Sequence, residues 1–120
     1  HNNFFICNYG SSMCVDNDDG SSYYKIHNNF EVYGGHKSNF GGHSKSTYNS
    51  IQAFARAYQE GLCMRVRSND LPGYVEGYWN NTCIQSTTTA PYTTIEYCNP
   101  KTKDTLPIMY NNRVYNKDAD

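Results

Sequence analysis

The chain has 120 residues, the length of one domain, and it contains twelve Tyr and five Phe. Its 10 basic and 11 acidic residues give a formal net charge of -1 without a long run of one sign. This balance excludes a strong electrostatic footprint for nucleic acid or for an anionic membrane. No apolar run is long enough to span a bilayer. We therefore expect a single domain over residues 1–120, with no nucleic-acid partner and no membrane span.

Short strand-forming runs recur along the chain, and each follows an asparagine-containing turn. They are HNNFFI at His1, HNNFEV at His27, TYNSIQAF at Thr47, YWNNTCI at Tyr78 and MYNNRVY at Met109. A second series lies between them: MCVDN at Met13, HKSNF at His36 and LCMRV at Leu62. Two interleaved series of short strands predict a solenoid whose coils each add one strand to several parallel sheets.

Stacking of such coils places equivalent residues about 4.8 Å apart. Asparagines at equivalent turns can then form a hydrogen-bonded ladder, and aromatic rings can stack inside in the same way. Tyr23, Tyr74 and Tyr78 are expected on the surface, because the interior is too small for all twelve tyrosines. The segment from Ser50 to Gly61 has both helical and alternating spacing, and the repeat favours a strand there.

The residues CVDNDDGSSYYKIHNNFEVYGGHKSNFGGH, from Cys14 to His43, are followed by GYWNNTCI and PIMYNNRVY. Together they resemble the right-handed parallel β-helix proteins of the pectate-lyase-like group, of the type found in extracellular proteins of microalgae and other protists. The resemblance implies a β-helix fold. Some members of that group cleave or epimerise acidic polysaccharides, and many have no known activity, so the fold assigns no activity by itself.

Two kinds of site are compatible with this fold. Asp16, Lys37, His43 and Arg65 could form a lyase or epimerase strip, in which a basic residue abstracts the proton α to a uronate carboxyl group. We expect Asp16 to lie near Ser38 or Asn39, with Arg65 one coil beyond. The alternative is a ladder of mixed charge that serves solubility and register.

The acidic stretch Asp16-Asn17-Asp18-Asp19-Gly20 does not match an EF-hand, because Val15 would take the first ligand position. A looser calcium site of Asp16, Asp18 and Asp19 with backbone carbonyls is one interpretation. The other is a solvent-exposed turn in which Asp and Asn cap their own backbone.

Five cysteines and the sequon Asn80-Asn81-Thr82 favour an oxidising, extracellular setting and glycosylation of Asn80. We expect a Cys83–Cys98 disulfide, and next a Cys7–Cys14 disulfide. Cys14 and Cys63 are alternatively free, buried core residues. The chain begins at His1 and has no signal peptide, which suggests a processed product or a fragment with its signal upstream.

The sequence therefore predicts an all-β, right-handed parallel β-helix of about four or five coils. Its expected role is that of a secreted or cell-surface structural module within a larger assembly or filament, whose partners are other copies, other matrix chains and glycans. No cofactor is required in this role. The alternatives are a polysaccharide lyase or epimerase and a calcium-dependent glycan-binding module.

Overall fold

The computed structural model describes residues 1–6, 14–17, 21–38, 44–55, 63–67, 76–85, 93–96 and 107–116. Within these ranges the chain forms strands and no helix. The strands belong to three parallel sheets, which we name A, B and C.

Sheet A contains β1 (Phe4–Ile6), β4 (Phe30–Val32), β7 (Ile51–Ala55), β10 (Thr82–Gln85) and β13 (Arg113–Asn116), side by side in that order. Sheet B contains β2 (Val15–Asn17), β5 (His36–Ser38), β8 (Met64–Arg67) and β11 (Thr93–Glu96). Sheet C contains β3 (Lys25–His27), β6 (Ser46–Tyr48), β9 (Gly77–Trp79) and β12 (Ile108–Tyr110).

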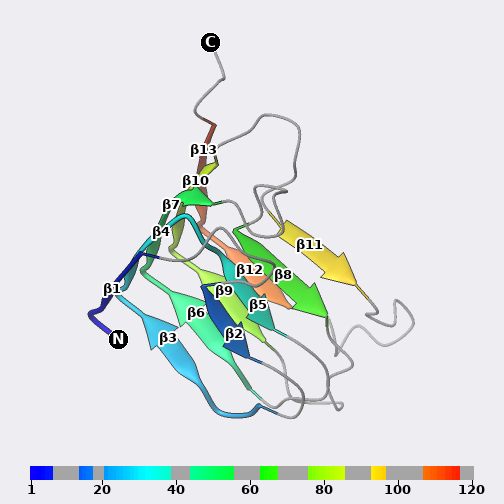
Figure 1. The fold of residues 1–120 in the computed structure, drawn as a ribbon. Helices are drawn as coiled ribbons and strands as arrows, with labels where there is room; N and C mark the ends of the chain where they lie inside the picture. The colour runs from blue at the N-terminus through cyan, green and yellow to red at the C-terminus, as the bar shows by residue number, and fades with distance from the viewer. Residues whose placement is uncertain are drawn as a thin grey trace.

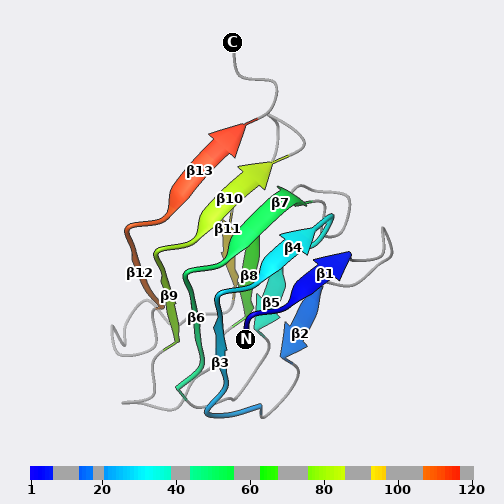
Figure 2. The same ribbon diagram turned by 90° about the vertical axis from the view of Figure 1, so that its left-hand side faces the viewer.

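The chain passes through sheets A, B and C in the same order four times before it enters β13, and we call each passage a rung (Figure 1). The rungs rise in sequence order from β1 to β13 (Figure 2). Both predicted strand series occur, and MCVDN, HKSNF and LCMRV contribute to one sheet as expected. The all-β class is confirmed, and parallel strands in stacked sheets are compatible with a parallel β-helix.

An asparagine with a positive φ stands shortly before every strand of sheet A, and from β4 onward it links that strand to the preceding strand of sheet C. These residues have φ between 52° and 58°, and they are Asn2, Asn28, Asn49, Asn80 and Asn111. Asn tolerates the left-handed region better than most residues, because its short side chain can hydrogen-bond locally. The recurrent asparagines of the sequence are therefore the residues that turn the chain between these two sheets.

The residue after each of these asparagines forms the predicted ladder. Asn3 N donates to Asn29 Oδ1 at 3.0 Å, and Ser50 N donates to Asn81 Oδ1 at 3.0 Å. Asn81 N continues the series to Asn112 Oδ1 at 3.0 Å. Ser50 replaces asparagine in the third rung, and its Oγ accepts from Asn29 N at 3.2 Å. The ladder thus ties all the rungs together along the stack.

Aromatic rings form a second ladder, which lies on the outer side of sheet C. Neighbouring rings are parallel, with centroids 4.7 to 5.8 Å apart, in the order His1, His27, Tyr48, Trp79 and Tyr110. The expectation that aromatic rings stack inside is therefore wrong for this row. Successive side chains of a strand point to opposite faces of the sheet. In the strands of sheet C, the residue before each ring therefore points inward.

Candidate functional site

Charged residues from three neighbouring strands form a row on the outer face of sheet B. Asp16 of β2 is paired in register with Lys37 of β5, and Lys37 is paired with Arg65 of β8. Lys37 Nζ lies 2.8 Å from Asp16 Oδ1. The structure thus brings together three of the four residues of the predicted lyase strip.

The expected register of Asp16 was wrong, because Asp16 faces Lys37 instead of Ser38 or Asn39. Alternation along β5 points His36 into the stack and Lys37 outward, and His36 is buried. A shift by one residue would bring Asp16 opposite a residue of the inner face. The observed register places opposite charges side by side.

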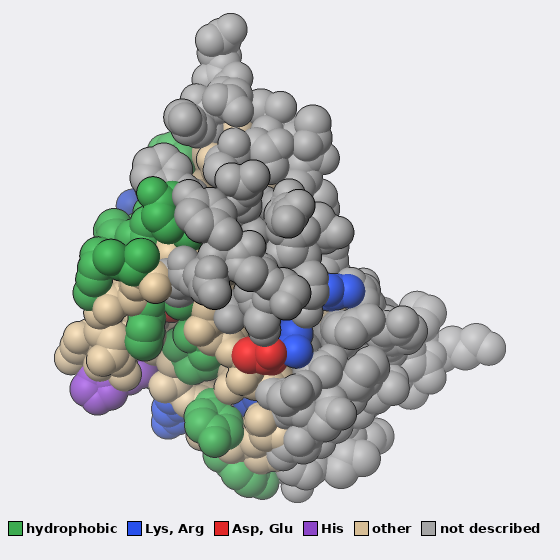
Figure 3. Space-filling model, viewed as in Figure 1, with side chains coloured by type: hydrophobic (Ala, Val, Ile, Leu, Met, Phe, Trp, Pro, Cys, Tyr) green, Lys and Arg blue, Asp and Glu red, His purple; other side chains and the backbone are tan. Residues whose placement is uncertain are grey.

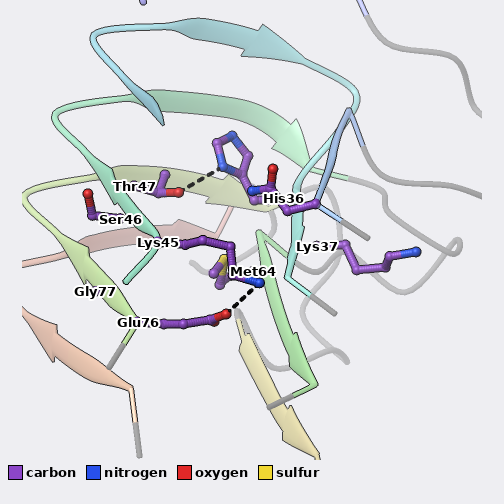
Figure 4. Close-up of a pocket in the computed structure, with 9 residues that line it drawn as sticks. His36, Lys37, Lys45, Ser46, Thr47, Met64, Glu76 and Gly77 are labelled. Atoms are coloured by element: carbon purple, nitrogen blue, oxygen red, sulfur yellow. Dashed lines mark hydrogen bonds and ion pairs between the residues drawn. The ribbon is translucent and has the colours of Figure 1, made fainter. Parts of the chain in front are cut away.

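Lys37 borders a cavity that is too small for a sugar. The cavity that it borders has a volume of about 10 Å³ and is also lined by His36, Lys45, Met64 and Glu76. Such a volume fits about one water molecule. In Figure 4 the Lys37 ammonium group points away from His36, Lys45 and Glu76.

The other predicted ligands and the last member of the strip, His43, Asp18 and Asp19, lie outside the described residues. Within the described ranges, no group of three or more His, Cys, Asp or Glu side chains could hold a metal ion. Asp16 already has Lys37 as its counter-charge. For this carboxylate, a bound cation is not needed to offset like-charge repulsion.

The interior of the middle rungs contains charged side chains. His36 Nε2 lies 2.6 Å from both carboxylate oxygens of Glu31, and His36 Nδ1 lies 3.2 Å from Thr47 Oγ1. Both members of the Glu31–His36 pair are fully buried. The imidazole of His36 thus joins Glu31 of sheet A to Thr47 of sheet C inside the stack.

A second buried pair crosses from one rung to the next. Lys45 Nζ lies 2.9 Å from Glu76 Oε1, and both side chains are buried (Figure 4). Each residue directly precedes a strand of sheet C, and the two strands, β6 and β9, are neighbours. Buried charges are tolerated when they are paired in this way.

Three of these interior residues, Glu31, Lys45 and Glu76, were not predicted from the sequence. A usable signal existed for Glu31, which stands between Phe30 and Val32 at the middle of a three-residue strand. Alternation places that middle residue on the opposite face from its neighbours. No comparable signal marks Lys45 or Glu76, since both lie outside the strands.

Two expectations for single tyrosines are tested by the structure. Tyr23 is exposed, as predicted, whereas Tyr78 is only 1% exposed and belongs to the core with Met64 and Val66. Tyr78 takes the inward position of β9, where its hydroxyl finds a partner in Gln52. Tyr74 lies outside the described residues.

The cysteine pairing also differs from the prediction. Cys63 and Cys83 form a disulfide, with Cα atoms 6.0 Å apart, so the expected Cys83–Cys98 bond is wrong. Both sulfur-bearing side chains are buried, and Cys63 is therefore buried but not free. Cys14 is disulfide-bonded as well, while Cys7 and Cys98 lie outside the described residues. Disulfides are typical of oxidising compartments, so this bond is weakly consistent with an extracellular protein.

A shallow groove runs along the corner between sheets C and A. Its volume is about 520 Å³, and it is lined by the turn residues and first strand residues of three rungs: Asn2, Asn3, Phe4, Asn28, Asn29, Phe30, Asn49 and Ile51. Hydrophobic side chains gather on the side of the molecule that sheet A forms (Figure 3). Asn80, the sequon residue, is exposed and occupies the next position in the same row of turns.

Comparison with protein-family models, with curated proteins and with solved structures finds no match to this chain. In the part of the chain that the structure describes, no helix is long and apolar enough to cross a membrane. Function must therefore be argued from the site itself.

Proposed function

We propose that this chain is an extracellular structural module, a right-handed parallel β-helix that is glycosylated at Asn80 and forms part of a larger assembly. The observation that carries the proposal is the continuity of the ladders. Asparagine side chains and aromatic rings repeat from the first rung to β13. Regular stacking of this kind stabilises a particle along one axis and leaves its end faces able to accept another coil.

The two outer strands of sheet A, β1 and β13, carry matching groups. Inside the chain, Asn81 N donates to Asn112 Oδ1, and Tyr110 stacks on Trp79. A second copy placed with β1 against β13 repeats these contacts, with Asn112 N donating to Asn3 and Tyr110 stacking on His1. Open strand edges recruit other chains by this route.

The row of inward-facing side chains along sheet A also supports end-to-end stacking of two copies. Its members in the second and third rungs are the polar residues Glu31 and Gln52, whereas the outer strands have Phe5 and Val114 there. Val114 is 42% exposed, although the same row is buried at Glu31 and Gln52 in the middle of the sheet. Coverage by a neighbouring coil would bury this apolar surface.

The test is sedimentation of the secreted chain over a range of concentrations. We expect particles larger than one chain, and we expect Val114→Lys, which puts a charge at the end face, to abolish them. Ile51→Lys is the matched control, because it adds the same charge on the outer face of the middle strand β7. A chain that stays monomeric at every concentration would overturn the proposed assembly. Association that is lost in Ile51→Lys but not in Val114→Lys would show that the chains associate through the outer face of sheet A and not through its end faces.

A polysaccharide lyase or epimerase is the second candidate, and the row of Asp16, Lys37 and Arg65 on one sheet favours it. The contact between Lys37 and Asp16 weakens it, because the lysine would have to leave this carboxylate to act on a substrate. Assay of acidic polysaccharides for unsaturated products decides this case. Turnover that disappears in Lys37→Ala would replace the structural role with an enzymatic one.

A further inference from the structure

We infer that the glycan on Asn80 lies along the groove between the asparagine turns and sheet A, and covers the apolar side chains there. This inference rests on the glycosylation included in the proposed function. It specifies the occupant of the groove: the sugars that this chain carries itself.

The Asn80 carboxamide is already oriented. Its Oδ1 accepts a hydrogen bond from Asn111 Nδ2 at 2.7 Å, from the following rung. Since Oδ1 and Nδ2 diverge from the same carbon and Oδ1 faces Asn111, Nδ2 is directed away from the Asn111 amide. Within the described part of the chain, Asn80 Nδ2 makes no hydrogen bond. A sugar on Nδ2 therefore leaves the contact with Asn111 intact, and it can extend over the preceding rungs, where the groove lies.

The groove begins where that sugar would arrive. Asn49 and Ile51 line its near end, followed by Asn28 and Phe30 in the next rung. Strands in a sheet are about 4.8 Å apart, so these two rungs lie about 5 and 10 Å from the strand that follows Asn80. The first sugars of an N-linked glycan can span this distance.

The chemistry of the groove suits a carbohydrate. Asn28 and Asn49 expose their carboxamides, and these side chains make no hydrogen bond to the described residues. An amide can both donate to and accept from sugar hydroxyls. Phe30 and Ile51 are 38% and 39% exposed, so they can contact the C–H faces of the sugars.

The aromatic ladder offers no equivalent site on which a sugar could stack. The rings from His1 to Tyr110 lie face to face with one another, so their faces between the two ends are already occupied. Phe4 and Phe30 are also stacked, with centroids 5.5 Å apart, so the face that each ring turns toward the other is covered. A sugar in the groove contacts the surface of these rings that stays exposed. The glycan would also solubilise apolar side chains that otherwise promote aggregation.

The test combines mass spectrometry with hydroxyl-radical footprinting of the chain secreted from a eukaryotic host. Phe30 should be oxidised severalfold more slowly in the glycosylated protein than in Thr82→Ala, which removes the sequon and keeps Asn80. Thr82→Ser retains the sequon and should retain the protection. Tyr24, exposed and outside the groove, is the internal reference and should react equally in all variants.

A displaced glycan provides the decisive control. In Thr82→Ala with Arg113→Thr, the sequon moves to Asn111, one rung farther from the groove, and protection of Phe30 should disappear. An unmodified Asn80 would overturn the glycosylation in the proposed function together with this inference. A glycosylated Asn80 without protection of Phe30, or equal protection by the displaced glycan, would overturn the inference alone.

Discussion

Tyr78 and Gln52 meet inside the stack, where the Tyr78 hydroxyl donates a hydrogen bond to Gln52 Oε1. The other end of the Gln52 amide, Nε2, donates to the carbonyl oxygen of Cys63 at 2.9 Å. This chain of contacts joins sheets A and C and the segment that leads into sheet B. Side-chain hydrogen bonds thus hold the three sheets together where aliphatic side chains are scarce.

Tyr78→Phe should lower the free energy of unfolding by about 1–3 kcal/mol, because it leaves the buried Gln52 oxygen without its donor. Tyr110→Phe is the matched control. Tyr110 is 52% exposed, and its hydroxyl makes no hydrogen bond to the described residues, so we expect no measurable change. Urea unfolding followed by circular dichroism measures both variants, and equal stabilities would contradict the role of this hydrogen bond.

Glu76→Gln should lower the free energy of unfolding further, since it removes the carboxylate that pairs with the buried Lys45 ammonium. Breaking a buried ion pair by removing one member typically costs about 3–5 kcal/mol. Replacing both residues, in Lys45→Met with Glu76→Leu, should recover much of the loss. Thermal unfolding of the single and double variants gives the comparison, and a double variant as unstable as the single one would contradict the explanation.

Reduction of the Cys63–Cys83 disulfide should destabilise the protein by about 3 kcal/mol, given the sequence separation of 20 residues. Cys63→Ala and Cys83→Ala should have the same effect as each other, because each removes the same bond. Peptide mapping without reduction identifies the bond directly. Recovery of a Cys83–Cys98 peptide would contradict the structure.

Gly77→Ala should displace Trp79 from the aromatic ladder. A Cβ atom on Gly77 would lie 2.8 Å from Trp79 Cε3, closer than van der Waals contact allows. Trp79 is the chain's one tryptophan, so its fluorescence and near-ultraviolet circular dichroism report the ladder directly. We expect both signals to change, with a stability loss of about 1–3 kcal/mol from overpacking.

Ser46→Ala is the matched control for that experiment. Ser46 has the same register position in the neighbouring strand β6, and its Cβ atom is already accommodated. The tryptophan signals should therefore stay as they are. A Gly77→Ala protein with unchanged spectra would show that Trp79 can adopt another position within the stack.

The repeat of strands and turns can be read along the chain without knowledge of the fold. An asparagine in each rung can take the left-handed backbone conformation, and the residue after it continues the ladder, so these residues predict the C-to-A turns. Alternation predicts that MCVDN, HKSNF and LCMRV are strands, and their repetition predicts that they share a sheet. These features depend on local backbone preference and on periodicity, and both are readable along the chain.

The contacts between residues of different rungs become visible in the folded structure alone. The pairing of Asp16 with Lys37 depends on a register that one residue of slip would change. Cys83 bonds to Cys63 because stacking brings the middle of β10 beside the residue before β8. The burial of Lys45 and Glu76 is tolerated because the two side chains form an ion pair. Such contacts are set by the spacing and stacking of distant segments, which composition and local pattern do not encode.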